Sequence, residues 1–364
     1  MRAFVCVIAA AIGLAAAPAL AQGDPVAATS WKAVQARCNA TAAKPASALG
    51  ERIAKGAIAE FDRFGGHRVD ADGHMFHFGL TEAEHEPEYD GERKPRLGDL
   101  AWWRVIEYWR ALYGKDFAED LEVRGYRDAS TTTGADEPAT LLHNDLSVLL
   151  RAADAVSDAE TREIMREAAL RAAVIDTPWS AAFVSYVIKE AGVGANAFHF
   201  ANAHRVFIYD AFATSAAELK GSTGDQLYRA CPLSTTKPRV GDLLCMQREP
   251  ALAGASEQDV RERIRSELSD SPDARTVRKT HCDIVSYVDV PARKMYVVGG
   301  NVYNSITVKK LNLSGRRLTF SAVQKHDCGG PGHWTMPAPS GKPSPPLTTC
   351  SLNDKKWFVL LQLR

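Results

Sequence analysis

One helical segment constrains the fold of this chain more than any other stretch. Residues 176–194 read DTPWSAAFVSYVIKEAGVG, and apolar side chains occupy almost every face of the helix that they predict. Thr177 or Asp176 can cap its start, and Pro178 suits the first helical position. Gly192 ends it. A helix that is hydrophobic all round must be buried, so we expect it to pack inside the molecule against a sheet.

Ser180 falls in the first turn of this helix, where backbone N–H groups have no partner within the helix. The positive end of the helix dipole lies at the same place. It favours negative charge on a nucleophile or on the oxygen that the nucleophile attacks. Serine is also common in a first turn for purely local hydrogen-bonding reasons. The position alone therefore leaves a catalytic role and a capping role open.

The segments around this helix predict helices first and an antiparallel sheet afterwards. Helical spacing is found in 50–64, 97–114, 141–155, 158–174 and 198–212. Strand patterns with short turns follow in 240–246, 281–290, 294–300, 305–313 and 355–363. This order indicates an α+β fold. The aromatic residues of 97–114 follow helical spacing, so we expect them in the core, although a platform for stacking sugars is the alternative.

The start of the chain has the pattern of a secretory signal peptide over residues 1–21. A basic start and an apolar, alanine-rich stretch precede the small-x-small site Ala19-Leu20-Ala21. We therefore expect a bacterial protein that is periplasmic or secreted. No later segment is apolar for long enough to cross a bilayer. Lys plus Arg and Asp plus Glu both number 44, and this near-zero net charge argues against nucleic acid as a partner.

Changes in composition divide the remaining chain into three parts. Residues 22–49 are rich in Ala, Thr and Ser and predict a flexible lead-in. Residues 50–325 predict one domain, with a helical part over 50–175 and a core over 176–325 that contains a charged insert at 249–280. Residues 326–364 predict a Gly/Pro-rich tail and a closing strand.

The cysteines indicate disulfides rather than a metal site. Cys6 lies in the signal peptide, and an even number in the rest of an exported chain favours disulfides. No Cys-x-x-Cys and no zinc-type spacing occurs, so we expect no structural zinc. The sequence implies no other metal and no organic cofactor. Cys245 ends one predicted strand and Cys282 starts the next, so antiparallel pairing can bring them face to face. Spacing does not settle the other pairs, for which Cys328–Cys350 and Cys38–Cys231 are the working hypotheses.

Two polar residues are expected at the same end of the predicted sheet. His281 begins one strand, Asn301 ends the next, and a tight turn near Pro291 joins the two strands. A hydroxyl, an imidazole and a carboxamide that orients the imidazole are the parts of a hydrolase triad. We therefore expect Ser180 as nucleophile, His281 as base and Asn301 as the orienting group.

Other polar or aromatic residues have two interpretations each. Asp283 shares a strand face with His281, which it could orient or charge, but a surface salt bridge is the alternative. Arg248 follows the first strand and either binds a carboxylate or is an ordinary strand-end charge. Trp179 precedes Ser180 and is a candidate for contacting substrate, together with Asp283.

The motifs PWSAAFVSYVIKEAG, GDLLCM, HCDIVSYV and VVGGNVYNS occur in this order. This order resembles the CHAP and NlpC-type amidase/peptidase superfamily, whose fold is papain-like. The resemblance implies a central helix packed on an antiparallel sheet, here preceded by several helices. It places Ser180 where those proteins carry a nucleophilic cysteine, His281 at the base and Asn301 at the third position.

A closer resemblance covers most of residues 50–325. The sequence resembles the secreted bacterial domain-of-unknown-function family 2272, which also carries Pro-Trp-Ser-Ala-Ala-Phe, Gly-Asp-Leu-x-Cys and Gly-Gly-Asn-Val. That family includes an Ala-His in the following helix. The resemblance therefore makes His204 a second candidate base or substrate contact, with a packing or capping histidine as the alternative.

The resemblance and the expected export imply a peptidoglycan amidase or peptidase with a Ser-His-Asn triad. Its partner would be peptidoglycan or a periplasmic peptide or protein. A cysteine reacts as a thiolate, whereas a serine hydroxyl must lose its proton to a base during attack. The alternative is therefore a catalytically inactive module that binds cell-wall peptide or a protein and has lost the nucleophilic cysteine.

Overall fold

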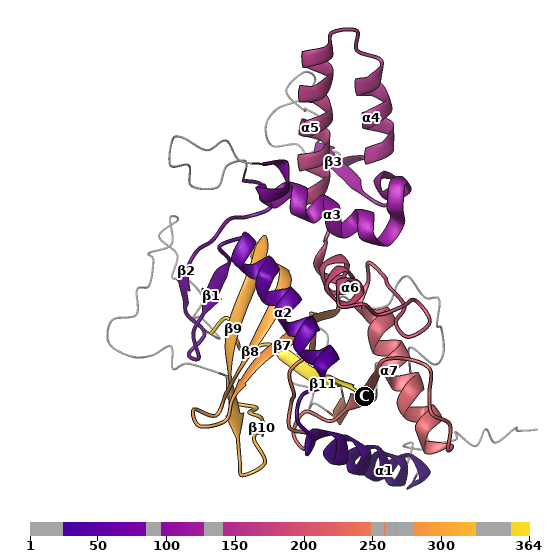
Figure 1. Ribbon diagram of the computed structural model, residues 1–364, viewed down its shortest axis with the longest axis vertical. Helices are drawn as coiled ribbons and strands as arrows, with labels where there is room; N and C mark the ends of the chain where they lie inside the picture. Colours follow the sequence, from indigo (N-terminus) through magenta and orange to yellow (C-terminus); the bar gives the residue numbers. More distant parts are fainter. Residues whose placement is uncertain are drawn as a thin grey trace, which may run out of the picture.

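The computed structural model describes residues 25–84, 96–126, 141–248, 280–324 and 351–364, with residues 258, 259, 262 and 266. The predicted signal peptide, most of the charged insert and the Cys328–Cys350 pair lie outside these residues. The helices are α1 Pro25–Ala42, α2 Ala48–Arg63, α3 Ala101–Tyr113, α4 Leu146–Asp154, α5 Ala159–Asp176, α6 Ser180–Glu190 and α7 His204–Leu219 (Figure 1). Short 3-10 turns flank α3 at Leu97–Asp99 and Gly114–Glu119.

The strands form one large sheet and one separate hairpin. They are β1 His67–Val69, β2 Met75–His77, β3 Glu122–Tyr126, β4 Leu141–Asp145, β5 Tyr228–Cys231, β6 Leu243–Gln247, β7 Thr280–Asp289, β8 Lys294–Val302, β9 Ser305–Ser314, β10 Thr319–Phe320 and β11 Lys356–Leu363. The large sheet runs β2-β1-β9-β8-β7-β6-β11-β5, with β10 on β9. Its pairs are antiparallel except β1 with β9. The α+β prediction is therefore confirmed.

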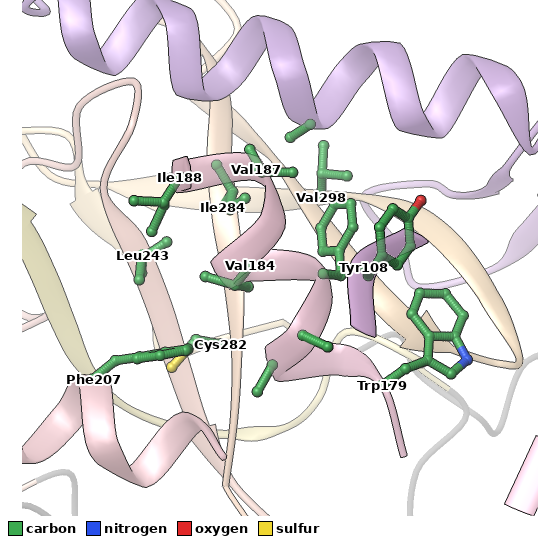
Figure 2. Close-up of a cluster of buried hydrophobic side chains, with 14 of the residues drawn as sticks. Tyr108, Trp179, Val184, Val187, Ile188, Phe207, Leu243, Cys282, Ile284 and Val298 are labelled. Carbon is green, nitrogen blue, oxygen red and sulfur yellow. The ribbon is translucent and has the colours of Figure 1, made fainter. Parts of the chain in front are cut away.

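Helix α6 is buried against helices α2 and α3 and against strands β7 and β8 of the large sheet (Figure 2). Its side chains Val184, Val187 and Ile188 pack in one cluster with sheet residues that include Leu243, Ile284 and Val298. The helix approaches β8 closely because Gly300 has no side chain: a Cβ there would lie 2.6 Å from the Cβ of Phe183. The all-round apolar pattern therefore predicts the burial of this helix correctly.

The start of α6 lies later in the chain than the capping pattern predicts. Helix α5 runs to Asp176, and Thr177 is its C-cap rather than the N-cap of α6. Pro178 keeps the residue before it out of the helical conformation, so the two helices are separated there. The hydroxyl of Thr177 instead accepts a hydrogen bond of 2.9 Å from the backbone N–H of Glu122. Ser180 is consequently the first residue of α6.

Helices α3, α4 and α5 with the β3–β4 hairpin form the helical part drawn at the top of Figure 1. Trp102, Tyr108 and Trp109 of α3 are buried, as the core interpretation of this segment predicts.

The prediction of a helix over 141–155 is wrong in its first part, where residues 141–145 form β4. Pairing of Asp145 with Glu122 and of its neighbours with β3 outweighs the local helical pattern there.

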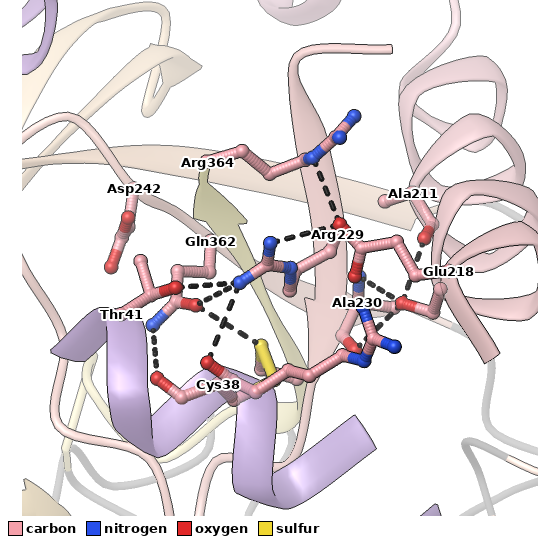
Figure 3. Close-up of a disulfide and its surroundings, with 12 residues drawn as sticks. Cys38, Thr41, Ala211, Glu218, Arg229, Ala230, Asp242, Gln362 and Arg364 are labelled. Atoms are coloured by element: carbon pink, nitrogen blue, oxygen red, sulfur yellow. Dashed lines mark hydrogen bonds and ion pairs between the residues drawn. A yellow bond between two sulfur atoms is a disulfide. The ribbon is translucent and has the colours of Figure 1, made fainter. Parts of the chain in front are cut away.

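Residues 25–42, expected within the flexible lead-in, form helix α1 instead. A disulfide joins Cys38 to Cys231 of β5, and Gln362 of β11 donates a hydrogen bond of 2.9 Å to the carbonyl of Cys38 (Figure 3). Arg229 of β5 bonds to the hydroxyl of Thr41 at 2.6 Å. These contacts come from distant parts of the chain, so the local composition does not indicate them. Segment 213–239 contains the end of α7 and strand β5.

The second disulfide confirms the pairing expected for the sheet. Cys245 of β6 lies opposite Cys282 of β7 in the strand register, and the two are bonded with a Cα–Cα distance of 4.0 Å. Strand β11, expected at the end of the fold, lies inside the sheet between β6 and β5. No helix of the described ranges is both long enough and apolar enough to cross a membrane.

Candidate active site

The first residues of two consecutive helices meet at the candidate nucleophile. Ser180 begins α6 and His204 begins α7. The Nε2 atom of His204 lies 2.8 Å from the Oγ atom of Ser180, a hydrogen-bond distance. Ser180 is 7% exposed and His204 is 4% exposed. The imidazole that contacts the serine is therefore that of His204, and not that of His281 as the triad prediction had it.

His281 belongs to a second group that lies on the sheet. Its Nε2 atom lies 2.7 Å from Oδ1 of Asp283, and Lys309 of β9 donates a hydrogen bond of 2.6 Å to Oδ2 of the same carboxylate. All three side chains are buried. Asp283 thus orients His281, as expected for one of its two interpretations, and it is not a surface salt-bridge residue.

Gly299 makes this contact between β7 and β9 possible. Strand β8 lies between the two, and a Cβ on Gly299 would come within 2.0 Å of the Asp283 carboxylate. Without a side chain at that point, the carboxylate occupies the space and Lys309 reaches it across β8. Gly299 therefore leaves room for the charge pair of Asp283 and Lys309, and Gly300 leaves room for helix α6.

The two groups are in contact through their imidazole rings. The ring centroids of His204 and His281 are 5.0 Å apart, with the planes inclined at 65°. The Nδ1 atoms of both rings are buried and have no hydrogen-bond partner within the described residues. The side chains therefore form a continuous series of contacts from the start of α6 into the sheet, in the order Ser180, His204, His281, Asp283 and Lys309.

Burial holds both imidazoles neutral. It lowers the pKa of His204 well below its ordinary value, and the neighbouring His281 adds to this effect. Burial likewise lowers the pKa of His281 to about 4, although Asp283 acts in the opposite direction. Burial alone would raise the pKa of Asp283, but Lys309 and His281 outweigh it and hold that pKa well below the usual range. A neutral His204 is able to accept a proton from Ser180.

Asn301 lies at the same end of the sheet but bonds elsewhere. The register that pairs Ile284 with Val298, when continued, places Asn301 level with His281. With its amide oriented to satisfy both partners, the Asn301 oxygen accepts from the backbone N–H of Trp179 at 3.0 Å and from its Nε1 at 3.3 Å. Within the described residues, no hydrogen bond joins Asn301 to either imidazole. It holds the start of α6 and does not orient the base.

A cavity of about 550 Å³ adjoins this site. Asn301 and Lys309 line it, and each also belongs to the site described above. The remaining described lining residues are Met246, Gln247, Arg248, Val302, Tyr303, Asp354, Lys355 and Lys356. The cavity therefore opens at the end of the sheet where β6 and β8 finish and β11 begins.

A family model described as an uncharacterized protein conserved in bacteria, domain-of-unknown-function family 2272, matches residues 96–363. The chain belongs to this family. The match begins later than the expected start at residue 50 and continues to β11, so the family 2272 domain includes the strand predicted to lie in a separate tail. No curated protein and no solved structure matches the chain.

Trp179 of this family 2272 protein is not a substrate contact. Its side chain is 0% exposed and packs against Phe64 and Tyr108, with ring centroids 5.9 Å away in both cases. Behind it, Glu60 accepts hydrogen bonds from Tyr108 at 2.6 Å and from Arg104 at 2.8 Å. Trp179 therefore fixes the start of α6 from the core side while Asn301 fixes it from the sheet side.

Lys309 is the site residue of this family 2272 chain that the sequence reasoning missed. It stands next to Lys310 in a strand, and adjacent strand residues point to opposite faces, so one of the two had to face inward.

Within the described residues, no cluster of three or more His, Cys, Asp or Glu side chains could hold a metal ion.

Proposed function

We propose that this family 2272 protein is an amide hydrolase that works by acyl transfer, with Ser180 as nucleophile and His204 as base. The observation that carries the proposal is the 2.8 Å contact between His204 Nε2 and Ser180 Oγ at the start of a buried helix. A nucleophile and a base within hydrogen-bond reach are the minimum for covalent catalysis by serine. The proposal keeps Ser180 of the predicted triad and exchanges His281 for His204.

In the proposed reaction, Ser180 Oγ attacks the amide carbonyl carbon while His204 Nε2 takes the hydroxyl proton. The C–N bond then breaks, the amine leaves with the proton from His204, and the acyl group remains on Oγ as an ester. A water molecule gives a proton to His204 and attacks this ester. The acid is released, and the proton returns to Oγ.

The first turn of α6 is suited to hold the negative oxygen of the intermediate. The first hydrogen bond of this helix runs from Phe183 N to Trp179 O at 3.0 Å, so the N–H groups of Ser180 and Ala181 precede it. Such groups have no partner inside the helix and point toward its mouth. They act on developing charge without reorganising, which is the usual form of an oxyanion hole.

Asp283 would act on the base through its charge, and His281 and Lys309 hold this carboxylate in place. When His204 takes the proton, it becomes a cation. The centroid of the His281 ring lies 5.0 Å from the centroid of the His204 ring, and the Asp283 carboxylate is bonded to His281. Asp283 raises the pKa of His204, against the effect of burial. It therefore stabilises the protonated form of His204. The aspartate of a Ser-His-Asp triad has the same role.

The order of motifs and the expected export support a cell-wall substrate. The motif order resembles CHAP and NlpC-type amidases and peptidases, and we propose that the core over 176–325 is related to their papain-like fold. Two disulfides tie the described chain, which is typical of proteins in an oxidising compartment. We therefore propose a periplasmic or secreted enzyme that acts on peptide amides of peptidoglycan.

A binding module is the second candidate. It is favoured by the 7% exposure of Ser180, because a substrate carbonyl needs more access than this closed arrangement gives. The cavity reaches Asn301 and Lys309, whereas Ser180 is not among the described residues that line it. In this case the cavity would bind a cell-wall peptide and the hydroxyl would only hydrogen-bond His204.

The test is covalent labelling with a fluorophosphonate, followed by incubation with purified peptidoglycan. A reactive serine forms a P–O bond and releases fluoride, so mass spectrometry should find the adduct on Ser180. Ser180→Ala and His204→Gln should lose both the adduct and product release, while the exposed control Ser222→Ala keeps them. An unlabelled wild type that still binds peptidoglycan would favour the binding module, and activity of Ser180→Cys alone would indicate a site that has lost its cysteine.

A further inference from the structure

The cavity beside the candidate site is lined by cations from three separate strands or strand ends. Arg248 follows β6, Lys309 lies in β9, and Lys355 and Lys356 stand at the start of β11. Sheet pairing brings these segments together, because β11 pairs with β6 from Lys356 onward. The side chains therefore converge on one volume of about 550 Å³, which suits a small peptide.

Most of this positive charge is not compensated by ion pairs. Lys309 is paired with Asp283 at 2.6 Å. Within the described part of the chain, Arg248, Lys355 and Lys356 form no salt bridge. Burial lowers the pKa of Lys355, and the charges of Lys309 and Arg248 lower it further, while the carboxylate of Asp354, the one acidic side chain among the described lining residues, acts in the opposite direction. Four cations and one carboxylate therefore line the cavity, and a bound anion would relieve the repulsion that remains among the cations.

The same cavity is connected to the catalytic residues by two side chains. Asn301 lines it and bonds to the backbone of Trp179, the residue before Ser180. Lys309 lines it and bonds to Asp283, the partner of His281. A ligand seated in the cavity would thus lie beside the helix mouth.

We infer that this cavity binds the carboxylate groups of an acidic peptide. Arg248 can bind a carboxylate through two parallel hydrogen bonds, and Lys355 and Lys356 add point charges around it. Only the statement that the peptide is also the substrate depends on the proposed function; the binding site itself does not. The inference names an acidic peptide as the class of substrate for the Ser180 site.

The test measures binding by titration calorimetry and uses Ala-Glu-Ala with free carboxylates as the probe. The same tripeptide with both carboxyl groups amidated is the matched ligand control. Wild-type protein should bind the free form at least about tenfold more tightly, because hydrogen bonds to charged groups contribute more than neutral ones. Arg248→Gln and Lys355→Gln should each weaken binding of the free form about tenfold. Exposed control variants Arg316→Gln and Lys220→Gln should leave it unchanged.

Three results would overturn the inference. They are equal affinity for the free and amidated tripeptides, full retention of affinity in Arg248→Gln and Lys355→Gln, and tighter binding of inorganic phosphate than of the free tripeptide. The ligand comparison uses unaltered protein, so it does not depend on whether a variant folds.

Ser180→Ala separates this inference from the proposed function. It should bind the free tripeptide as the wild type does, because Ser180 is not part of the cavity lining. Carboxylate-dependent binding without fluorophosphonate labelling would end the hydrolase proposal and support the anion site. Labelling without a preference for the free carboxylates would overturn the anion site and support the hydrolase.

Discussion

Ser180 and His204 are the first residues of α6 and α7, and their side chains meet between the two helix starts at 2.8 Å. The positive ends of two helix dipoles therefore point at the same pair of atoms. This field favours negative charge at the serine oxygen and disfavours a standing positive charge on the imidazole. The arrangement suits a base that is neutral at rest and protonated only during the reaction.

The two imidazoles should differ in their importance. Substitution His204→Gln removes the group in contact with Ser180 and should lower the rate of fluorophosphonate labelling by about 100- to 10,000-fold. His281→Gln should lower it less, because His281 contacts the base and not the nucleophile. Stopped-flow labelling rates compare the two variants, with circular dichroism to verify folding. A larger loss in His281→Gln would return the role of base to His281.

The acid limb of the pH–rate profile should lie below the ordinary histidine range. Burial lowers the pKa of His204, and a base works in its neutral form, so labelling should stay at its plateau as the pH falls through 6.5. Arg248 also lowers the pKa of His204. Arg248→Gln should therefore move the acid limb to higher pH, while the exposed control Arg316→Gln leaves it in place. A wild-type limb above pH 6.5 would contradict a buried base.

Gly300 should not tolerate a side chain. In Gly300→Ala the new Cβ would lie 2.6 Å from the Cβ of Phe183, so α6 must move away from β8. We expect the free energy of unfolding to fall by about 1–3 kcal/mol and labelling of Ser180 to be lost with it. Gly125→Ala in β3 is the matched control, because nothing lies within 4 Å of its Cβ position. Chemical denaturation measures both variants, and equal stability for the two would show that α6 does not depend on this approach.

The two disulfides should have separable effects. The double substitution Cys245→Ala/Cys282→Ala opens a loop with a sequence separation of 37, and should lower the free energy of unfolding by about 2–4 kcal/mol. It should also slow labelling, since Cys282 is the neighbour of His281. Cys38→Ala/Cys231→Ala should destabilise the protein but leave the labelling rate of the folded fraction unchanged, because α1 is attached at the β5 edge. Equal effects of both pairs on labelling would contradict this separation.

The parts of the fold that the sequence predicts best are those set by local patterns. The alternation around His281 and the tight turns at the strand ends determine β7 and β8 and bring Cys245 opposite Cys282. Helix α1 escapes prediction because its Ala- and Thr-rich composition carries little signal. Its buried residues Val34 and Cys38 pack in one cluster with partners from distant parts of the chain.

The identity of the base could not be predicted from strand alternation. Alternation fixes which face of the sheet His281 occupies, but residues 191–203 determine where the start of α7 lies, and their path depends on tertiary packing. Ser185 bonds to the backbone of Ala201 within that connection, at 2.9 Å from its hydroxyl to the carbonyl. Contacts of this kind bring His204 to Ser180, and no motif spacing indicates them.

Strand β11 has a consequence for the order in which the chain can assemble. It fills the position between β6 and β5, so these two strands cannot belong to a continuous sheet until residue 363 has left the ribosome. Before β11 pairs, β5 and β6 would each present an open hydrogen-bonding edge. Pairing of β5 with the rest of the sheet therefore depends on the described strand that is synthesised last, so the sheet is completed late in folding.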